Sequence, residues 1–184
     1  TPNGGFEWFG RGQGDLCLTA YGLLQFKDMA RVHDVDPKLL ERTTRWLLAR
    51  QNSDGSWHPT NRGEQASQAV VLETTAYIGW AVANSPALDP NARQRLIAFL
   101  SNQSPYQIDS PYTLALVLQA LRSLDPQHAQ LSTFRARLVS LQQQTEDGAG
   151  WWNRASAGRT LFLGHGPVAV VETTALAVLA LHDD

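Results

Sequence analysis

The sequence repeats one unit, in which a Gly-aromatic turn and a loop precede a nearly uncharged helix that begins near a Thr-Ala pair. Gly5-Phe6 precedes Leu18-Thr19-Ala20-Tyr21, Asp54-Gly55-Ser56-Trp57 precedes Glu73-Thr74-Thr75-Ala76-Tyr77, and Asp147-Gly148-Ala149-Gly150-Trp151 precedes Glu172-Thr173-Thr174-Ala175. A fourth apolar helix starts at Ser110-Pro111-Tyr112-Thr113 without the turn. A helical hairpin cannot bury its apolar helix alone, so the hairpins must stack.

Apolar residues at helical spacing predict seven helices, and no segment is a convincing strand. Four of the helices start with an Asp-Pro or Ser-Pro pair, which supplies a capping side chain and a proline at the first helical position. The predicted helices are Asp15–Val32, Asp36–Gln51, Gln68–Ala83, Asp89–Gln103, Ser110–Leu124, Asp125–Gln144 and Val168–Leu181.

Two kinds of helix alternate along the chain. The helices that start at Asp36, Asp89 and Asp125 are amphipathic, while the others are nearly free of charge and must be buried on most sides. The sequence therefore predicts an all-α fold, an α/α-toroid-like stack of helical hairpins with inner and outer helices. With about seven helices the toroid is incomplete, and we expect an open curved piece or a dimer that covers the exposed apolar faces.

Composition places the chain among ordinary soluble globular proteins. It has 184 residues, 43% apolar and 17% charged residues, and a net charge of -2, which suits one domain, residues 1–184. The absence of a Lys/Arg run predicts no nucleic-acid partner, and no apolar stretch is long enough for membrane insertion. Cys17 is the single cysteine and is expected to be a buried, inert thiol. Both ends are expected to be cuts within a larger protein.

The stretch from Gln51 to Trp57 is typical of a helix end followed by a tight turn. Gly55 is expected to take a positive φ, and Gln51 to bind the free carbonyls at the helix end. Trp57 is expected to cover the junction with the next helix, as a clamp between hairpins. An aromatic platform for a ligand is the competing interpretation, but the motif recurs with the hairpins, whereas a binding site usually occurs once.

Gln-x-x-Asp-Gly-Ser-Trp resembles the repeat element of the α/α-toroid superfamily. The stretches GGFEWFGRGQGDLCLTAY, RWLLARQNSDGSW and VVETTALAVLAL resemble, in this order, the thioester-containing domains of α2-macroglobulins and complement proteins, here of a bacterial type. The resemblance implies a parent protein that traps proteases, placed in the periplasm or outside the cell. It implies a structural and shielding role for this chain, with no enzymatic activity and no cofactor. Its partners would be proteases, through the parent, and neighbouring domains of the same chain.

The thioester of this family joins a Cys to a Gln three residues later, in Cys-x-Glu-Gln. Arg62-Gly63-Glu64-Gln65 has Arg where the Cys would stand, and Cys17 is followed by Ala20 at the required spacing. The chain is therefore expected to hold no thioester, which either lies upstream or was lost. His58 is a candidate for the His that assists transacylation in some relatives; a solvated loop histidine is the competing interpretation.

A different class of function, a toroid enzyme, has its own candidate residues. Glu73 and Glu172 occupy equivalent places in the repeat and, with Glu7 and Asp15, could ring one mouth of a barrel, as in glycoside hydrolases. The alternative is that each Glu stabilises the N-terminus of an inner helix.

Metal-dependent or cyclase chemistry is a further alternative. Asp15-Leu16-Cys17 resembles the zinc-binding Asp-x-Cys of prenyltransferases. The third ligand is not evident from the sequence, and His165, which precedes the last helix, is a candidate for it. Asp34 and Asp36 resemble the Asp-rich motif of terpenoid cyclases, although Asp36 is expected to serve as a helix cap. A pure interaction module without a thioester is the remaining interpretation.

Overall fold

A computed structural model describes residues 1–9, 12–59, 66–153 and 159–182 of the chain. Within these residues it has seven α-helices, one short 3-10 helix and one pair of two-residue strands, which confirms the predicted all-α class. The elements are α1 (Leu16–Met29), α2 (Pro37–Leu48), α3 (Gln68–Val82), α4 (Pro90–Ser101), η1 (Pro105–Gln107), α5 (Pro111–Leu124), α6 (Leu131–Ser140), β1 (Gln143–Gln144), β2 (Gly150–Trp151) and α7 (Pro167–Leu181).

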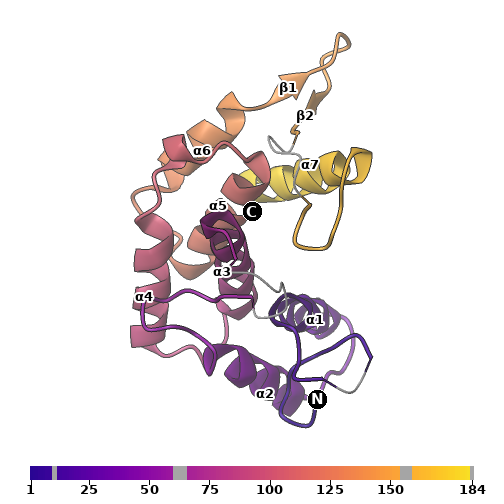
Figure 1. Cartoon of the computed structure of the whole chain (residues 1–184), viewed down its shortest axis with the longest axis vertical. Helices are drawn as coiled ribbons and strands as arrows, with labels where there is room; N and C mark the ends of the chain where they lie inside the picture. Colours follow the sequence, from indigo (N-terminus) through magenta and orange to yellow (C-terminus); the bar gives the residue numbers. More distant parts are fainter. Residues whose placement is uncertain (10–11, 60–65, 154–158, 183–184) are drawn as a thin grey trace.

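The odd-numbered helices form a row in which α1 packs on α3, α3 on α5 and α5 on α7. The even-numbered helices lie outside this row: α2 packs on α1, α4 on both α3 and α5, and α6 on α5. In Figure 1, α4 and α6 follow one side of the molecule, with α3 and α5 at its centre. The predicted alternation of inner and outer helices is therefore present.

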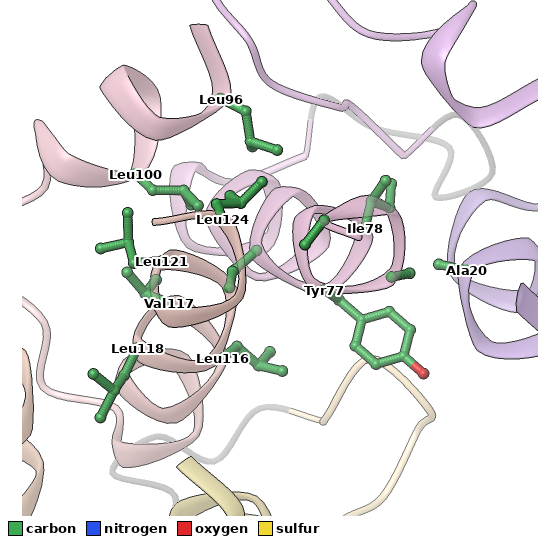
Figure 2. Packing of buried hydrophobic residues seen from close by; sticks show 14 of the residues in the cluster. Ala20, Tyr77, Ile78, Leu96, Leu100, Leu116, Val117, Leu118, Leu121 and Leu124 are labelled. Atoms are coloured by element: carbon green, nitrogen blue, oxygen red, sulfur yellow. The ribbon is translucent and has the colours of Figure 1, made fainter. Parts of the chain in front are cut away.

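The core is centred on α3 and α5. Burial covers 11 of the 15 residues of α3 and 12 of the 14 residues of α5, and Leu96 and Leu100 of α4 point into the same cluster (Figure 2). The helices at the two ends of the row, α1 and α7, have four buried residues each. The prediction that every uncharged helix is buried on most sides is thus wrong for α1 and α7, which each lack one inner neighbour.

Most helix starts follow the predicted chemistry. The side chains of Asp15, Asp36, Asp89 and Ser110 each accept a hydrogen bond from a backbone N–H in the first turn of their helix. The prediction at Asp125-Pro126 is wrong, because α6 begins only at Leu131. Asp125 instead ends α5, and its carboxylate accepts from the backbone N–H of Gln127, so that the chain turns before the next helix can start.

A small antiparallel hairpin corrects the prediction that helix continues to Gln144. Gln143 pairs with Trp151 and Gln144 with Gly150, and the turn between them is closed at Gly148, whose φ is +84°. The hairpin projects from the top of the molecule in Figure 1, beyond α6. It lengthens the third aromatic turn before the chain returns to α6 and α7 at Trp152.

Cationic side chains from neighbouring helices bind the C-terminal carbonyls of the inner helices. Lys27 Nζ of α1 donates to Ala81 O of α3 over 2.5 Å. The guanidinium of Arg93 in α4 donates to Ala83 O (2.6 Å) and to Leu124 O (2.8 Å), at the ends of α3 and α5. Arg122 of α5 donates to Leu179 O of α7 over 3.2 Å. The carbonyls that a helix leaves open at its end are thus satisfied from the adjacent helix.

Candidate functional site

The Gly-aromatic turn after α2 is built around Trp57, whose side chain is fully buried. Its indole Nε1 donates to Leu47 O of α2 over 2.8 Å, and its backbone N–H donates to the hydroxyl of Thr75 in α3 over 2.9 Å. The Thr75 hydroxyl donates in turn to Trp57 O over 3.5 Å. Trp57 is therefore held by the helix before it and by the inner helix after it, as the clamp interpretation predicts.

The same arrangement occurs in the third turn. Trp152 Nε1 donates to Leu138 O of α6 over 2.8 Å, and the backbone N–H of Trp152 donates to the hydroxyl of Thr174 in α7 over 3.1 Å. The clamp residue is Trp152 and not Trp151, because the β1–β2 hairpin lengthens this turn. With Trp57 fully buried and Trp152 only 3% exposed, neither indole is a platform for a ligand.

The first turn keeps the backbone half of this arrangement. Phe6 N–H donates to the hydroxyl of Thr19 in α1 over 2.8 Å, as Trp57 does to Thr75. The threonine of each Thr-Ala pair thus binds the backbone of the preceding aromatic residue. The repeat contained this threonine, but its spacing alone did not reveal which side chain would bind it.

Gly55 has the predicted positive φ, +91°, and lies against α4. A Cβ at this position would lie 2.4 Å from Arg95 O, so glycine is required both by conformation and by space. Gln51 donates to Gly55 O (3.2 Å) and to Ala92 O of α4 (3.3 Å). It therefore links the turn to the next outer helix, whereas the sequence predicted a contact with the end of α2.

The two glutamates of the repeat both bind α5, which lies between their helices. Thr113 Oγ1 donates to Glu73 Oε1 over 2.7 Å, and Glu73 is only 2% exposed. Tyr112 OH donates to Glu172 Oε1 over 3.1 Å and accepts from Leu161 N–H over 3.3 Å. Burial, with Glu172 as a second cause, raises the pKa of Tyr112 above its usual range.

Glu7 and Asp15, the other carboxylates of the predicted ring, have partners of their own. Glu7 accepts from Gly12 N–H, and Asp15 caps α1 by accepting from Leu18 N–H over 2.8 Å. All four carboxylates are therefore engaged in local or inter-helix hydrogen bonds.

Asp15 and Cys17 line a cavity of about 280 Å³ together with Trp8, Thr74 and Leu163. Cys17 is half-buried and not fully buried as predicted, and its Sγ lies 3.9 Å from Thr74 Oγ1. His165 is exposed, and its Nδ1 lies 3.4 Å from Leu163 O. Within the described part of the chain, no three His, Cys, Asp or Glu side chains are grouped so that they could hold a metal.

His58 is exposed and lines a separate groove of about 440 Å³ with Gln13, Trp46 and Arg50. The residues that resemble a thioester sequence, Arg62 to Gln65, lie outside the described residues. The Ser56 hydroxyl and backbone N–H both donate to Asp54 Oδ1, which closes an Asx turn before Trp57. The hydrogen bond from the Ser56 hydroxyl lowers the pKa of Asp54.

A model of a known protein family matches almost the whole chain. The family model described as the A-macroglobulin TED domain matches residues 1–183. In the described residues, no helix has the length and apolar character that crossing a membrane requires.

Proposed function

Because the chain belongs to the family of A-macroglobulin TED domains, we propose that it is a structural module of an α2-macroglobulin-like protein that traps proteases. The module has no thioester of its own and no enzymatic activity. Its role is to shield a thioester of the parent or to rearrange against neighbouring domains. The parent is a bacterial protein of the periplasm or the extracellular space.

The observation that carries this proposal is the use of the repeated motifs for packing. The turn indoles bind helix carbonyls, and the threonines of the inner helices bind the turns. Glu73 and Glu172, the candidates for a toroid hydrolase, accept hydrogen bonds from Thr113 and Tyr112 of α5. The polar groups that the repeat shares thus hold helices together, which favours a structural module over an enzyme.

The outer face of α7 supports the proposal that residues 1–184 are one part of an α/α toroid. Aligning Glu172-Thr173-Thr174-Ala175 with Glu73-Thr74-Thr75-Ala76 makes Val171 equivalent to Leu72 and Val178 equivalent to Gly79. Leu72 is 7% exposed, and a Cβ at Gly79 would meet Leu96 of α4 and Ala120 of α5. By contrast, Val171 is 70% and Val178 53% exposed. We infer that another part of the parent packs on this face, as α4 and α5 pack on α3.

The test uses the full-length parent and titrates free thiols before and after methylamine treatment. We expect one new thiol per chain, because methylamine opens a thioester and releases its cysteine. The chain of 184 residues is the control and should expose only Cys17. If the parent releases no thiol, the covalent mechanism is wrong.

A second test addresses the structural role and uses Val171→Glu with Val178→Glu in the parent. We expect the parent to lose protease trapping, measured as protection of a protein substrate, because the charges would prevent packing on α7. The control is Val32→Glu, because Val32 is 88% exposed and lies outside the helices. Unchanged trapping in the α7 variant would contradict the proposed role of this face.

A further inference from the structure

A cavity of about 560 Å³ lies where the C-terminal ends of α1 and α3 meet the first turns of α2. This volume is in the range of small-molecule sites, which are mostly walled by apolar and aromatic side chains and hold a few polar groups that orient the ligand. The apolar residues that line this cavity come from all three helices and from the loop after α3: Leu24, Pro37, Leu40, Trp80 and Pro86.

Lys27 of α1 lines the same cavity and supplies a cation. Its Nζ donates to Ala81 O over 2.5 Å, which uses one of the three N–H donors of an ammonium group. Among the residues that the structure describes, no carboxylate forms an ion pair with Nζ. Burial lowers the pKa of Lys27, so the contact with Ala81 O does not fully compensate for the water that the charge has lost.

The other charged residues of the cavity balance one another. The Glu41 carboxylate accepts from Arg45 Nη2 over 2.6 Å, so a guanidinium already neutralises it. Asp28 and Arg31 carry opposite charges at the C-terminal end of α1. The positive charge of Lys27 is left over. A cavity with apolar walls and one uncompensated cation is complementary to an apolar molecule that carries a single negative charge.

We propose that this cavity binds a small aromatic or apolar monocarboxylate, with its carboxylate on Lys27 Nζ and its apolar body against Trp80 and Leu40. The two N–H donors of Nζ that Ala81 O does not use can bind the carboxylate, and such charge-assisted hydrogen bonds strengthen where water is partly excluded. Asn84, which also lines the cavity, offers an amide N–H₂ as a further donor. This binding site is independent of the protease-trapping function proposed above.

The experiment is isothermal titration calorimetry of the chain with indole-3-propionate and with its neutral analogue indole-3-propionamide. We expect the carboxylate to bind about tenfold more tightly than the amide, because only the carboxylate compensates for the charge of Lys27. This comparison needs no variant. N-acetyltryptophan, which ends as a peptide C-terminus does, is titrated in parallel. If it binds more tightly than indole-3-propionate, the carboxylate belongs to a peptide end, and if it binds less tightly, to a free acid.

Variants separate Lys27 from general positive charge. Lys27→Gln keeps a side-chain N–H for Ala81 O but removes the charge, so it should weaken carboxylate binding about tenfold and change amide binding less than about twofold. The control is Lys38→Gln, which removes the other lysine of the chain, outside the cavity, and should change both by less than about twofold. Circular dichroism of each variant shows that the helices are still folded.

Three outcomes would overturn the proposal. Equal binding of indole-3-propionate and its amide would show that the cavity does not select a carboxylate. Equal effects of Lys27→Gln and Lys38→Gln would show that only net charge matters. Tighter binding of tryptamine, the cationic analogue, than of indole-3-propionate would show that Asp28 and Glu41 determine the charge preference of the cavity.

Discussion

Trp57 Nε1 donates a hydrogen bond to Leu47 O over 2.8 Å and so joins the aromatic turn to the last turn of the outer helix before it. The equivalent bond from Trp152 to Leu138 has the same length. A large aromatic side chain that is fully buried and also makes a directed hydrogen bond fixes both the position and the angle of a helix end. The turn motif is therefore a structural joint that the fold uses at two places.

Replacing either clamp tryptophan tests this joint. Trp57→Phe or Trp152→Phe removes the indole donor and leaves part of the ring volume empty, so we expect a loss of about 1–3 kcal/mol in the free energy of unfolding. Trp8→Phe is the control, because Trp8 is 70% exposed, and should change it by less than about 0.5 kcal/mol. Urea denaturation measures all three, and similar values for Trp57 and Trp8 would contradict the clamp.

Comparing two glycines with positive φ separates the cost of a left-handed backbone from the cost of a steric clash with α4. Gly55 (φ +91°) faces Arg95 O, whereas a Cβ at Gly148 (φ +84°) would meet nothing within 4 Å. Gly148→Ala should therefore cost only the left-handed conformation, about 1–2 kcal/mol. Gly55→Ala should cost clearly more in the same thermal or urea unfolding measurement, since α4 must also move. Equal losses would show that α4 yields without cost.

The buried carboxylate of Glu73 gives opposite expectations for a structural and a catalytic role. Glu73→Ala should destabilise the fold by about 1–3 kcal/mol, because Thr113 loses its acceptor. Glu73→Gln keeps an acceptor oxygen and should cost less. The double variant Glu73→Ala with Thr113→Val should show a coupling of about 0.5–3 kcal/mol in a double-mutant cycle. A catalytic Glu73 would instead give Glu73→Gln with unchanged stability and a measurable loss of glycoside hydrolysis.

Alkaline pH should unfold the chain progressively. Burial raises the pKa of both Tyr77 and Tyr112 above the usual range, so the folded chain keeps two protons that the unfolded chain releases above about pH 10. The unfolded state then binds fewer protons, and the free energy of unfolding falls by about 1.4 kcal/mol per pH unit for each tyrosine. Burial lowers the pKa of Lys27. This residue therefore makes the free energy of unfolding rise with pH, but only up to about pH 10.4.

The measurement is urea denaturation between neutral pH and pH above the usual tyrosine range. Tyr77→Phe removes one of the two buried tyrosine hydroxyls. Above pH 10.5, where Lys27 no longer contributes, it should therefore reduce the slope of the free energy of unfolding against pH by about half. An unchanged slope in Tyr77→Phe would show that this hydroxyl is accessible to hydroxide in the folded state.

Sequence patterns predicted the structure correctly where the role of a residue depends only on its own side chain or backbone conformation. Asp89 and Ser110 cap their helices with their own side chains, and Gly55 takes a positive φ in its own turn; all three were predicted correctly. Asp125-Pro126 was not, because whether such a pair starts a helix depends on the chain reversal that α5 and α6 need. Trp152 was missed for Trp151, since two adjacent tryptophans give the same repeat signal until the length of the β1–β2 hairpin is known.

The candidate site was less predictable, because its contacts join separate helices. The partners of Glu73 and Glu172 are Thr113 and Tyr112, which belong to a helix without the turn motif. No spacing in the sequence indicates which helix lies between two members of a repeat. The sequence predicted exposed apolar faces on an open stack, but not that α7 would carry one. The composition of α7 is that of a buried helix, and its exposure becomes clear only from which helices pack on it.

The cations that bind the C-terminal carbonyls have a consequence for how this molecule comes apart. Arg93 contributes to the ends of α3 and α5 at once, and α7 depends on Arg122 of α5. Detaching one hairpin would remove from its neighbours the side-chain donors that bind these carbonyls. Partial melting is therefore penalised at every boundary between hairpins, and a stack assembled from repeats should lose its structure in one cooperative transition and not by fraying from its ends.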